Sequence, residues 1–257
     1  IFETREYFKR IYRVLRANNP EGVILQHLLG TTRTAAENFT DIFIFGEVYV
    51  HSVAGKESYY DIFKPTPMKI AYGYRSGEQA VKMIKEFSLS LATQRPDRYK
   101  QWSPDQPEAD RAMKHFLAYL LVHDIEPYPE YWIPEKAIFR STQVYDAEDW
   151  LSRNYAASEF YPYWDKTLSH PAVITESTTD AANAVLLSSR RDGDRMMTSI
   201  VNDTDQEQTI TVEFKKFSAG SAFNAFDKLN ERYVIRDNRL VLKLGPREGK
   251  ILCISEK

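Results

Sequence analysis

The stretch Asp41-Ile42-Phe43-Ile44-Phe45-Gly46-Glu47-Val48-Tyr49 decides how the rest of the chain is interpreted. Its first half is a short run of β-branched and aromatic residues, which is typical of a strand buried on both faces. The run ends abruptly in Gly46-Glu47. Because α/β barrels and open α/β sheets bind their ligands at the carboxyl ends of parallel strands, Glu47 is the first candidate for a functional site.

The segments before this stretch repeat a helix–strand order. Residues 4–17 carry apolar side chains at helical spacing and predict an amphipathic helix, which Asn18-Asn19-Pro20-Glu21-Gly22 ends. The following run, 23–27, predicts a buried strand whose last residue is His27. Each predicted strand therefore has a polar residue at its carboxyl end, and we expect His27 and Glu47 to lie on neighbouring strand ends.

The same order continues downstream. A long loop over 49–67 leads to a predicted strand over 68–74, and residues 76–79 match a capping box that opens a helix to about residue 92. Another helix begins at Pro107. Periodicity leaves residues 120–125 open as a helix end or as a last barrel strand, and residues 146–151 predict a short capped helix.

After residue 160 the sequence changes to short β-type runs separated by turn residues. The turns include Asp192-Gly193, the segment 202–205 and the segment 236–238. The predicted strands are 172–176, 184–189, 195–201, 208–214, 232–235, 239–244 and 249–255. Strands at this spacing indicate a β-sandwich.

The fold class expected is therefore α/β: a partial (β/α)8-type barrel, its C-terminal half, followed by a small all-β sandwich. The domain boundary is predicted near residue 157, with a barrel-like part over 1–157 and a sandwich over 158–257. Too few strands are present to close an eight-stranded barrel. The chain also starts at Ile1 rather than Met, so we expect it to be part of a longer polypeptide whose N-terminal part precedes it.

Composition limits the partners. The 257 residues are 43% hydrophobic and 27% charged, as in an ordinary globular protein, and the net charge of −2 gives no electrostatic reason to expect nucleic acid or a membrane surface as partner. The only cysteine, Cys253, excludes an internal disulfide and a cysteine zinc cluster. No HExxH, P-loop, GxGxxG or GxSxG motif occurs, so we expect neither a metal nor a cofactor.

Aromatic residues are unusually frequent, at 13% with 16 Tyr and 4 Trp. Rings with a polar group suit amphipathic ligands such as sugars, although core packing is the more common reason for such rings. Tyr49, Tyr74 and Trp132 are the candidate stacking platforms.

Several of these runs together resemble glycoside hydrolase family 123-like proteins. The resemblance rests on 5–27, on Thr40-Asp41 through Gly46-Glu47, on 120–125 and on the aromatic run 160–164, and it covers most of the chain in order. It implies a barrel with a C-terminal sandwich that hydrolyses β-linked N-acetylhexosaminides with help from the substrate's acetamido group. It also implies an extracytoplasmic protein, periplasmic or secreted, with a carbohydrate substrate.

One departure concerns the catalytic residues. The family uses an adjacent Asp-Glu pair at an earlier barrel strand, and no Asp-Glu dipeptide occurs in this sequence. No catalytic residue is therefore carried over, and the pair is expected upstream of Ile1. The sugar-binding residues that the resemblance implies are His27, Glu47 and Asp124.

Each candidate also has a structural alternative. Glu47 can hold a sugar hydroxyl or act as acid or base, or it can form an ion pair with a neighbouring cation. His27 can bind sugar or be a satisfied core histidine, and Asp124, after His123, can complete a polar ring or lie in the turn that ends a helix.

Three functions remain open. The first is a glycoside hydrolase acting on β-linked, possibly N-acetylated, hexosaminides or a related polysaccharide. The second is a non-catalytic carbohydrate-binding or scaffold protein with a degenerate barrel cleft. The third is a hydrolase that pairs Glu47 with another acid of this chain.

Overall fold

A computed structural model gives the structure of the chain. It describes residues 2–22, 24–27, 39, 42–44, 107–125, 135–179, 184–215 and 219–256. The predicted strand 68–74, the helix 76–92 and the loops around them lie outside these residues.

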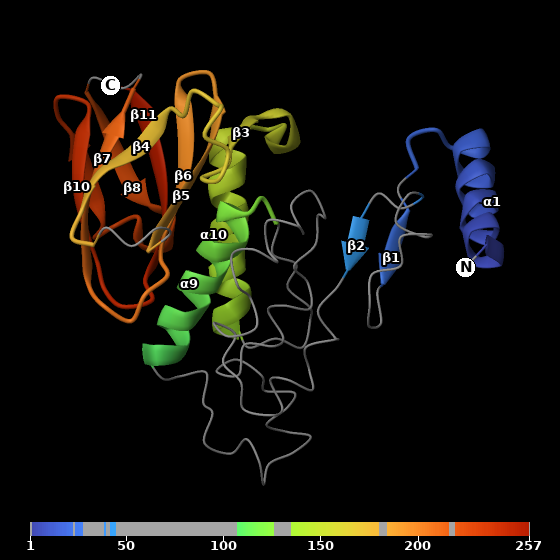
Figure 1. The fold of residues 1–257 in the computed structure, drawn as a ribbon, viewed down its shortest axis with the longest axis horizontal. Coiled ribbons are helices and arrows are strands. Elements are labelled where there is room, and N and C mark those ends of the chain that lie inside the picture. The colour runs from blue at the N-terminus through green and yellow to red at the C-terminus, as the bar shows by residue number, and fades with distance from the viewer. Residues whose placement is uncertain are drawn as a thin grey trace, which may run out of the picture.

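The N-terminal part contains one helix and a parallel strand pair. Helix α1 spans Phe2–Asn18, which confirms the predicted helix. Strands β1 (Leu25–His27) and β2 (Ile42–Ile44) pair in parallel. Figure 1 shows α1, β1 and β2 at the opposite end of the view from the strand-rich C-terminal part.

The C-terminal part consists of two antiparallel sheets. The larger has the order β3-β5-β6-β11-β8-β9, and its strands are β3 (Glu159–Tyr161), β5 (Val185–Asp192), β6 (Arg195–Asn202), β8 (Gly220–Asn224), β9 (Arg232–Ile235) and β11 (Gly249–Glu256). The smaller has the order β10-β7-β4, with β4 (Ala172–Ser177), β7 (Gln208–Phe214) and β10 (Arg239–Leu244). The seven predicted strands are all present, and the structure adds β3 and β8 to them.

The two sheets share one hydrophobic core. Phe214, Leu242 and Leu244 of the smaller sheet are fully or nearly fully buried, and they belong to the same cluster as Met196 and Ile254 of the larger sheet. Burial alternates along β10, because its leucines face the core while the residues between them, including the apolar Val241, are exposed. This alternation follows the sequence pattern on which the predicted sandwich was based.

The larger sheet is buried on both faces. Its other face packs against helices α9 (Pro107–Val122) and α10 (Glu135–Leu151), and Figure 1 shows both helices alongside it. Met197, Val201 and Ile251 belong to the same cluster of buried residues as the apolar side chains of α9 and α10. Residues Met196–Asn202 are therefore buried in succession, which is expected for a strand between two apolar layers.

Helix α10 corrects the prediction of a short helix over 146–151. The helix begins eleven residues earlier, at Glu135. Its buried positions include Val144, Ala147 and Leu151, whereas Phe139 is 56% exposed. The apolar stripe is therefore weak in the first half of the helix, and periodicity alone does not reveal that half.

Two tight turns lie where the turn residues predict them. Strand β5 joins β6 next to Gly193, whose φ is +58°, and Asp192 pairs with Arg195 across the turn. Asp237 and Asn238 both have positive φ and connect β9 to β10. Because β9 and β10 belong to different sheets, this second turn also carries the chain across the core. Among the described helices, none is long and apolar enough to cross a bilayer.

Candidate functional site

The parallel strands β1 and β2 are the first part of the predicted site. Their register pairs His27 with Ile44, so the carboxyl ends of both strands lie at the same edge. The prediction that His27 ends its strand is confirmed. Glu47 follows the last residue of β2 by three positions, but Glu47, Tyr49, Tyr74 and Trp132 lie outside the described residues. Their roles stay predictions.

Asp124 lies just after helix α9, not at a strand end. The amide of Ile125 donates to Leu120 O at 3.0 Å and the amide of Asp124 donates to Leu121 O at 3.0 Å, the two bonds of a Schellman motif. Asp124 occupies the left-handed position of this motif, with φ 58°, where glycine is usual. The segment 120–125 is thus a helix end, and the alternative of a last barrel strand is wrong.

The carboxylate of Asp124 forms an ion pair with Arg190 of β5. The Arg190 Nε donates to Asp124 Oδ1 at 3.0 Å, and a second guanidinium nitrogen contacts the same oxygen. Arg190 Nη1 donates to Ser158 O at 2.9 Å. The guanidinium also lies over the rings of Tyr155 and Phe160, at 4.6 and 5.1 Å from their centroids. Arg190 therefore joins the end of α9 to the segment that enters the sheets.

This arrangement bears directly on the predicted role of Asp124. The exposed fractions of the Arg190 and Asp124 side chains are 6% and 16%, so the pair is largely withdrawn from water. Burial would lower the pKa of Arg190, but attraction to Tyr155 and Asp124 outweighs it and raises that pKa. Asp124 was predicted to complete a ring of polar groups at the strand ends. Its carboxylate is instead held by Arg190 of the larger sheet.

His123 is a core histidine with both ring nitrogens engaged. Its Nδ1 lies 2.8 Å from Tyr119 O, and a carbonyl oxygen only accepts, so Nδ1 carries the proton. Nε2 then accepts from the Tyr163 hydroxyl at 3.1 Å. Tyr119, Tyr163 and Trp164 all contact the imidazole ring. His123 is thus packed as a structural group.

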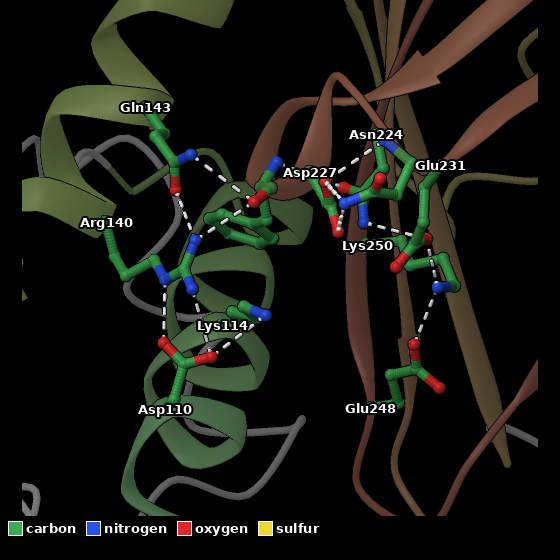
Figure 2. A network of polar contacts seen from close by, with 11 residues as sticks. Asp110, Lys114, Arg140, Gln143, Asn224, Asp227, Glu231, Glu248 and Lys250 are labelled. Atoms are coloured by element: carbon green, nitrogen blue, oxygen red, sulfur yellow. Dashed lines mark hydrogen bonds and ion pairs between the residues drawn. The ribbon is translucent and has the colours of Figure 1, made fainter. Parts of the chain in front are cut away.

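A polar network joins helix α9 to helix α10. Arg140 donates to both oxygens of Asp110, at 2.7 and 3.1 Å, and Lys114 Nζ lies 2.9 Å from the same carboxylate. Arg140 and Gln143 both donate to Phe226 O in the short 3-10 helix η4 (Ala225–Asp227). Figure 2 shows Arg140 between Asp110 and Gln143. Burial would raise the pKa of Asp110, but the hydrogen bonds from Arg140 and Lys114 hold it below its ordinary value.

A second network surrounds Lys250 of β11. Its ammonium lies 2.5 Å from Glu231 and 2.6 Å from Glu248, and Figure 2 shows it between the two carboxylates. Glu231 also accepts from Tyr233 at 2.7 Å and from Asn224 at 3.1 Å. Burial opposes charge on Lys250, but the two carboxylates raise its pKa. The Lys250 ammonium therefore compensates the negative charge of both carboxylates. Carboxylates held in this way do not suit the general acid and base of glycoside hydrolysis.

Burial keeps two other reactive groups, His115 and Cys253, in their uncharged forms. Burial lowers the pKa of His115 to about 3 and raises the pKa of Cys253 to about 12, so the imidazole stays neutral and the thiol stays protonated at neutral pH. No group of three or more His, Cys, Asp or Glu side chains within the described ranges could hold a metal ion. In the part of the chain that the structure describes, the polar clusters brace the fold.

Sequence reasoning missed Arg190 and Lys250 as buried cations. Arg190 belongs to the pair Arg190-Arg191, which follows a run of apolar and serine residues in β5. One charge of such a pair must face inward, because successive side chains of a strand point to opposite faces. That signal was available, but it does not reveal that Asp124, 66 positions earlier, is the partner.

No protein-family model matches this sequence, and no curated protein matches it. Solved structures do match. An α-amylase from Anoxybacillus is 9% identical, with a TM-score of 0.52, 98% of this chain covered and 56% of that chain. An α-amylase from Geobacillus thermoleovorans in complex with acarbose is 10% identical, with a TM-score of 0.55, 98% of this chain covered and 57% of that one.

A GH27 β-L-arabinopyranosidase from Geobacillus stearothermophilus, in complex with arabinose, is 10% identical, with a TM-score of 0.54, and the match covers 98% of this chain and 55% of that chain. The chain thus spans a little over half the length of these structures. All three are glycoside hydrolases, and at this level of identity the similarity concerns the fold. The chain has a sheet-rich, glycoside hydrolase-like fold.

Proposed function

We propose that this chain forms the C-terminal part of a glycoside hydrolase. In this proposal residues 1–157 supply the second half of a (β/α)8-type barrel and residues 158–257 form a β-sandwich that braces it. The observation that carries the proposal is a fold match over 98% of the chain to three glycoside hydrolases, each longer than this chain. The parallel pairing of β1 and β2 agrees with a barrel segment.

The substrate class follows from the resemblance in the sequence. We propose β-linked hexosaminides, possibly N-acetylated, or a related polysaccharide, with the Asp-Glu acid pair in a segment that precedes Ile1. His27, Glu47, Tyr49 and Tyr74 would then position the sugar. Because such polymers occur outside the cytoplasm, an extracytoplasmic location, periplasmic or secreted, belongs to the same proposal.

Asp124 has a weaker place in this proposal than the other candidates. Its carboxylate already accepts from Arg190. A role toward the sugar would have to use Asp124 Oδ2, the oxygen opposite the one that Arg190 contacts. The observed role of Asp124 is to fix the end of α9 against Arg190, so Glu47 is the residue to test first.

The test is a Glu47→Gln substitution in the longest natural form of the polypeptide. Glutamine keeps the shape of the side chain but removes its charge, so kcat/KM on an aryl β-N-acetylhexosaminide should fall by about tenfold or more. Glu207→Gln is the matched control, because Glu207 is an exposed acid that contacts Lys243 on the C-terminal sheets. Unchanged kinetics for Glu47→Gln would refute the positioning role.

A specific observation favours the second function, a carbohydrate-binding protein without activity. No Asp-Glu dipeptide occurs in the chain. If the preceding segment also lacks an acid pair, the polypeptide should bind chito-oligosaccharides, seen by calorimetry, without releasing product over days. Product release from the wild type would exclude this second function.

A further inference from the structure

A cleft lies at one edge of the two packed sheets, between β4 and β5. Its volume is about 400 Å³. Sites for small molecules occupy about 300–1,000 Å³, so the cleft has room for one sugar ring with a substituent. Its walls come from the segment before β4, from β4 and β5, and from Lys215 after β7.

The floor of the cleft is apolar and fixed by the core. Ala172 is 1% exposed and Leu187 is 6% exposed, and both belong to the cluster between the two sheets. Ile174 and Val185 pack against that cluster and also line the cleft. The floor is therefore preformed, which reduces the entropy lost when a ligand binds.

The rim of the cleft is cationic. Lys166 and Lys215 both line the cleft and are exposed. Within the described ranges, neither ammonium forms an ion pair or a hydrogen bond, and no carboxylate lines the cleft. Two unpaired ammonium groups over an apolar floor attract an anion and repel a cation.

The acids near the cleft in sequence are engaged elsewhere. Asp165 Oδ1 accepts from the backbone amide of Thr167 at 2.9 Å and from its hydroxyl at 2.6 Å. Glu176 accepts from Thr211 at 2.8 Å. These carboxylates are held by hydroxyl and amide donors, so they do not neutralise the two lysines through a direct contact.

Hydroxyl groups complete the lining. Ser177 and Thr179 lie on the wall formed by the end of β4. His170 Nε2 lies 2.5 Å from Asp165 O, and because a carbonyl only accepts, this nitrogen carries a proton. The cleft thus combines an apolar floor, hydroxyl groups on one wall and two cations at the rim.

We propose that this cleft is an accessory binding site for a sugar that carries a carboxylate, a uronate. The carboxylate would lie between Lys166 and Lys215, and the apolar face of the ring would lie on the floor. The assignment of a sugar rests on the proposed function, whereas the requirement for an anion rests on the cleft itself. The site lies on the C-terminal sheets, in a different part of the chain from the strand ends that carry His27 and Glu47.

The experiment titrates D-glucuronate into the 257-residue chain and follows backbone amide shifts by NMR. We expect binding in about the millimolar range, as for a single exposed sugar, with D-glucose at least about tenfold weaker because it lacks the carboxylate. Raising the salt concentration should weaken glucuronate binding, since the lysines are exposed.

Two variants distinguish binding in this cleft from a general attraction of the anion to positive charge on the protein. Lys166→Gln combined with Lys215→Gln should weaken glucuronate binding about tenfold. Lys243→Gln is the control, because its side chain is 68% exposed on the same pair of sheets but does not line the cleft, and it should leave binding unchanged.

The remaining outcomes each contradict one part of the proposal. If the double variant binds glucuronate as well as the wild type does, or if the wild type binds none, the cleft is not an anion site. If hexanoate binds as tightly as glucuronate, the anion site stands and the assignment of a sugar is overturned. When the longest natural form of the polypeptide carries the same two substitutions, its turnover of the aryl hexosaminide should be unchanged, so glycosidase activity and binding at this cleft are measured separately.

Discussion

At Asp124 the backbone conformation and the side-chain contacts favour different residues. A left-handed φ of 58° at the end of a helix favours glycine, which lacks a Cβ. The sequence has aspartate there, and its carboxylate contacts the buried Arg190. The ion pair therefore offsets the cost of the left-handed backbone.

A substitution of Asp124 tests this interpretation. Asp124→Asn keeps a residue that tolerates the left-handed region but removes the charge, so Arg190 keeps its burial without its counter-ion. The free energy of unfolding should fall by about 2 kcal/mol. Urea unfolding of the chain, followed by circular dichroism, measures the change.

The matched control is Asp205→Asn, another aspartate that pairs with an arginine. The side chain of Asp205 is 84% exposed in its pair with Arg247. Because solvent screens such a pair, the expected loss is below about 0.5 kcal/mol. Equal losses for the two variants would show that burial of the Asp124 pair has no energetic weight.

At the scale of elements, α9 lies unusually close to β11. A Cβ added at Gly249 would lie 2.7 Å from His115 Cα and 2.8 Å from Ala118 Cβ. The helix backbone and the strand backbone are therefore in direct contact at this point, and only glycine fits.

The close approach predicts the effect of Gly249→Ala. The added methyl group would push α9 away from the sheet, and the free energy of unfolding should fall by about 2 kcal/mol. Gly245→Ala is the control: its Cβ would meet only Glu248 Oε2, at 3.4 Å, so its effect should be small. Thermal unfolding of both variants measures the difference. If Gly249→Ala leaves the free energy of unfolding unchanged, α9 can move away from β11 without a loss of stability.

The contacts between elements also predict acid sensitivity. Burial opposes ionisation of Glu231, but hydrogen bonds from Lys250 and Tyr233 hold its pKa below its ordinary value of 4.5. Arg140 and Lys114 hold the pKa of Asp110 below 3.8 in the same direction. A carboxylate whose pKa is lowered on folding stabilises the folded state above its unfolded pKa, and this contribution is lost as pH falls through the folded value.

Stability should therefore be constant from neutral pH to about pH 5 and then fall toward pH 3 as these acids are protonated. The urea midpoint measured across this range tests the prediction. Asp110→Asn should lower the urea midpoint at pH 7 and reduce the fall of the midpoint below pH 5. If the midpoint of this variant falls below pH 5 as steeply as that of the wild type, Asp110 does not contribute to the acid sensitivity.

At the scale of the whole molecule, the predicted boundary near residue 157 separates segments that share a core. Helices α9 and α10 precede it, yet their buried side chains form one cluster with Leu186, Met197 and Ile251 of the larger sheet. Removing the helices would expose that face of the sheet to water. Each of these side chains gains about 1.5–3 kcal/mol from full burial, so the loss would be large for a marginally stable unit.

A pair of fragments tests this consequence. A fragment of residues 158–257 should be unfolded or aggregated, whereas a fragment of residues 105–257 should fold cooperatively. Far-ultraviolet circular dichroism and gel filtration distinguish the two. A soluble, cooperatively folded 158–257 fragment would show that the sheets do not need the helices.

Local sequence was sufficient for much of this fold. The strands Gln208–Phe214, Arg232–Ile235 and Arg239–Leu244 have the predicted bounds, because alternation of side chains and turn residues are local signals. Strand β8 (Gly220–Asn224) escaped prediction, because its sequence GSAFN has no regular alternation of apolar and polar residues. The strand pairs with β9 and β11, and this pairing is not a local signal.

For the candidate site residues, too, local sequence predicted some features and long-range contacts decided the others. That His27 ends a strand followed from local pattern, because the apolar run that begins at residue 23 ends in Gln26 and His27. The register that places His27 beside Ile44 is a property of the pairing with β2. The partners of Asp124 and His123 could not be inferred, because Arg190 and Tyr163 are 66 and 40 positions away in the chain. The sequence alone therefore specified most of the described strands, the helix α1 and the polar end of β1. Long-range packing decided which polar groups became structural, because a buried charge is stable only where the fold brings it a partner.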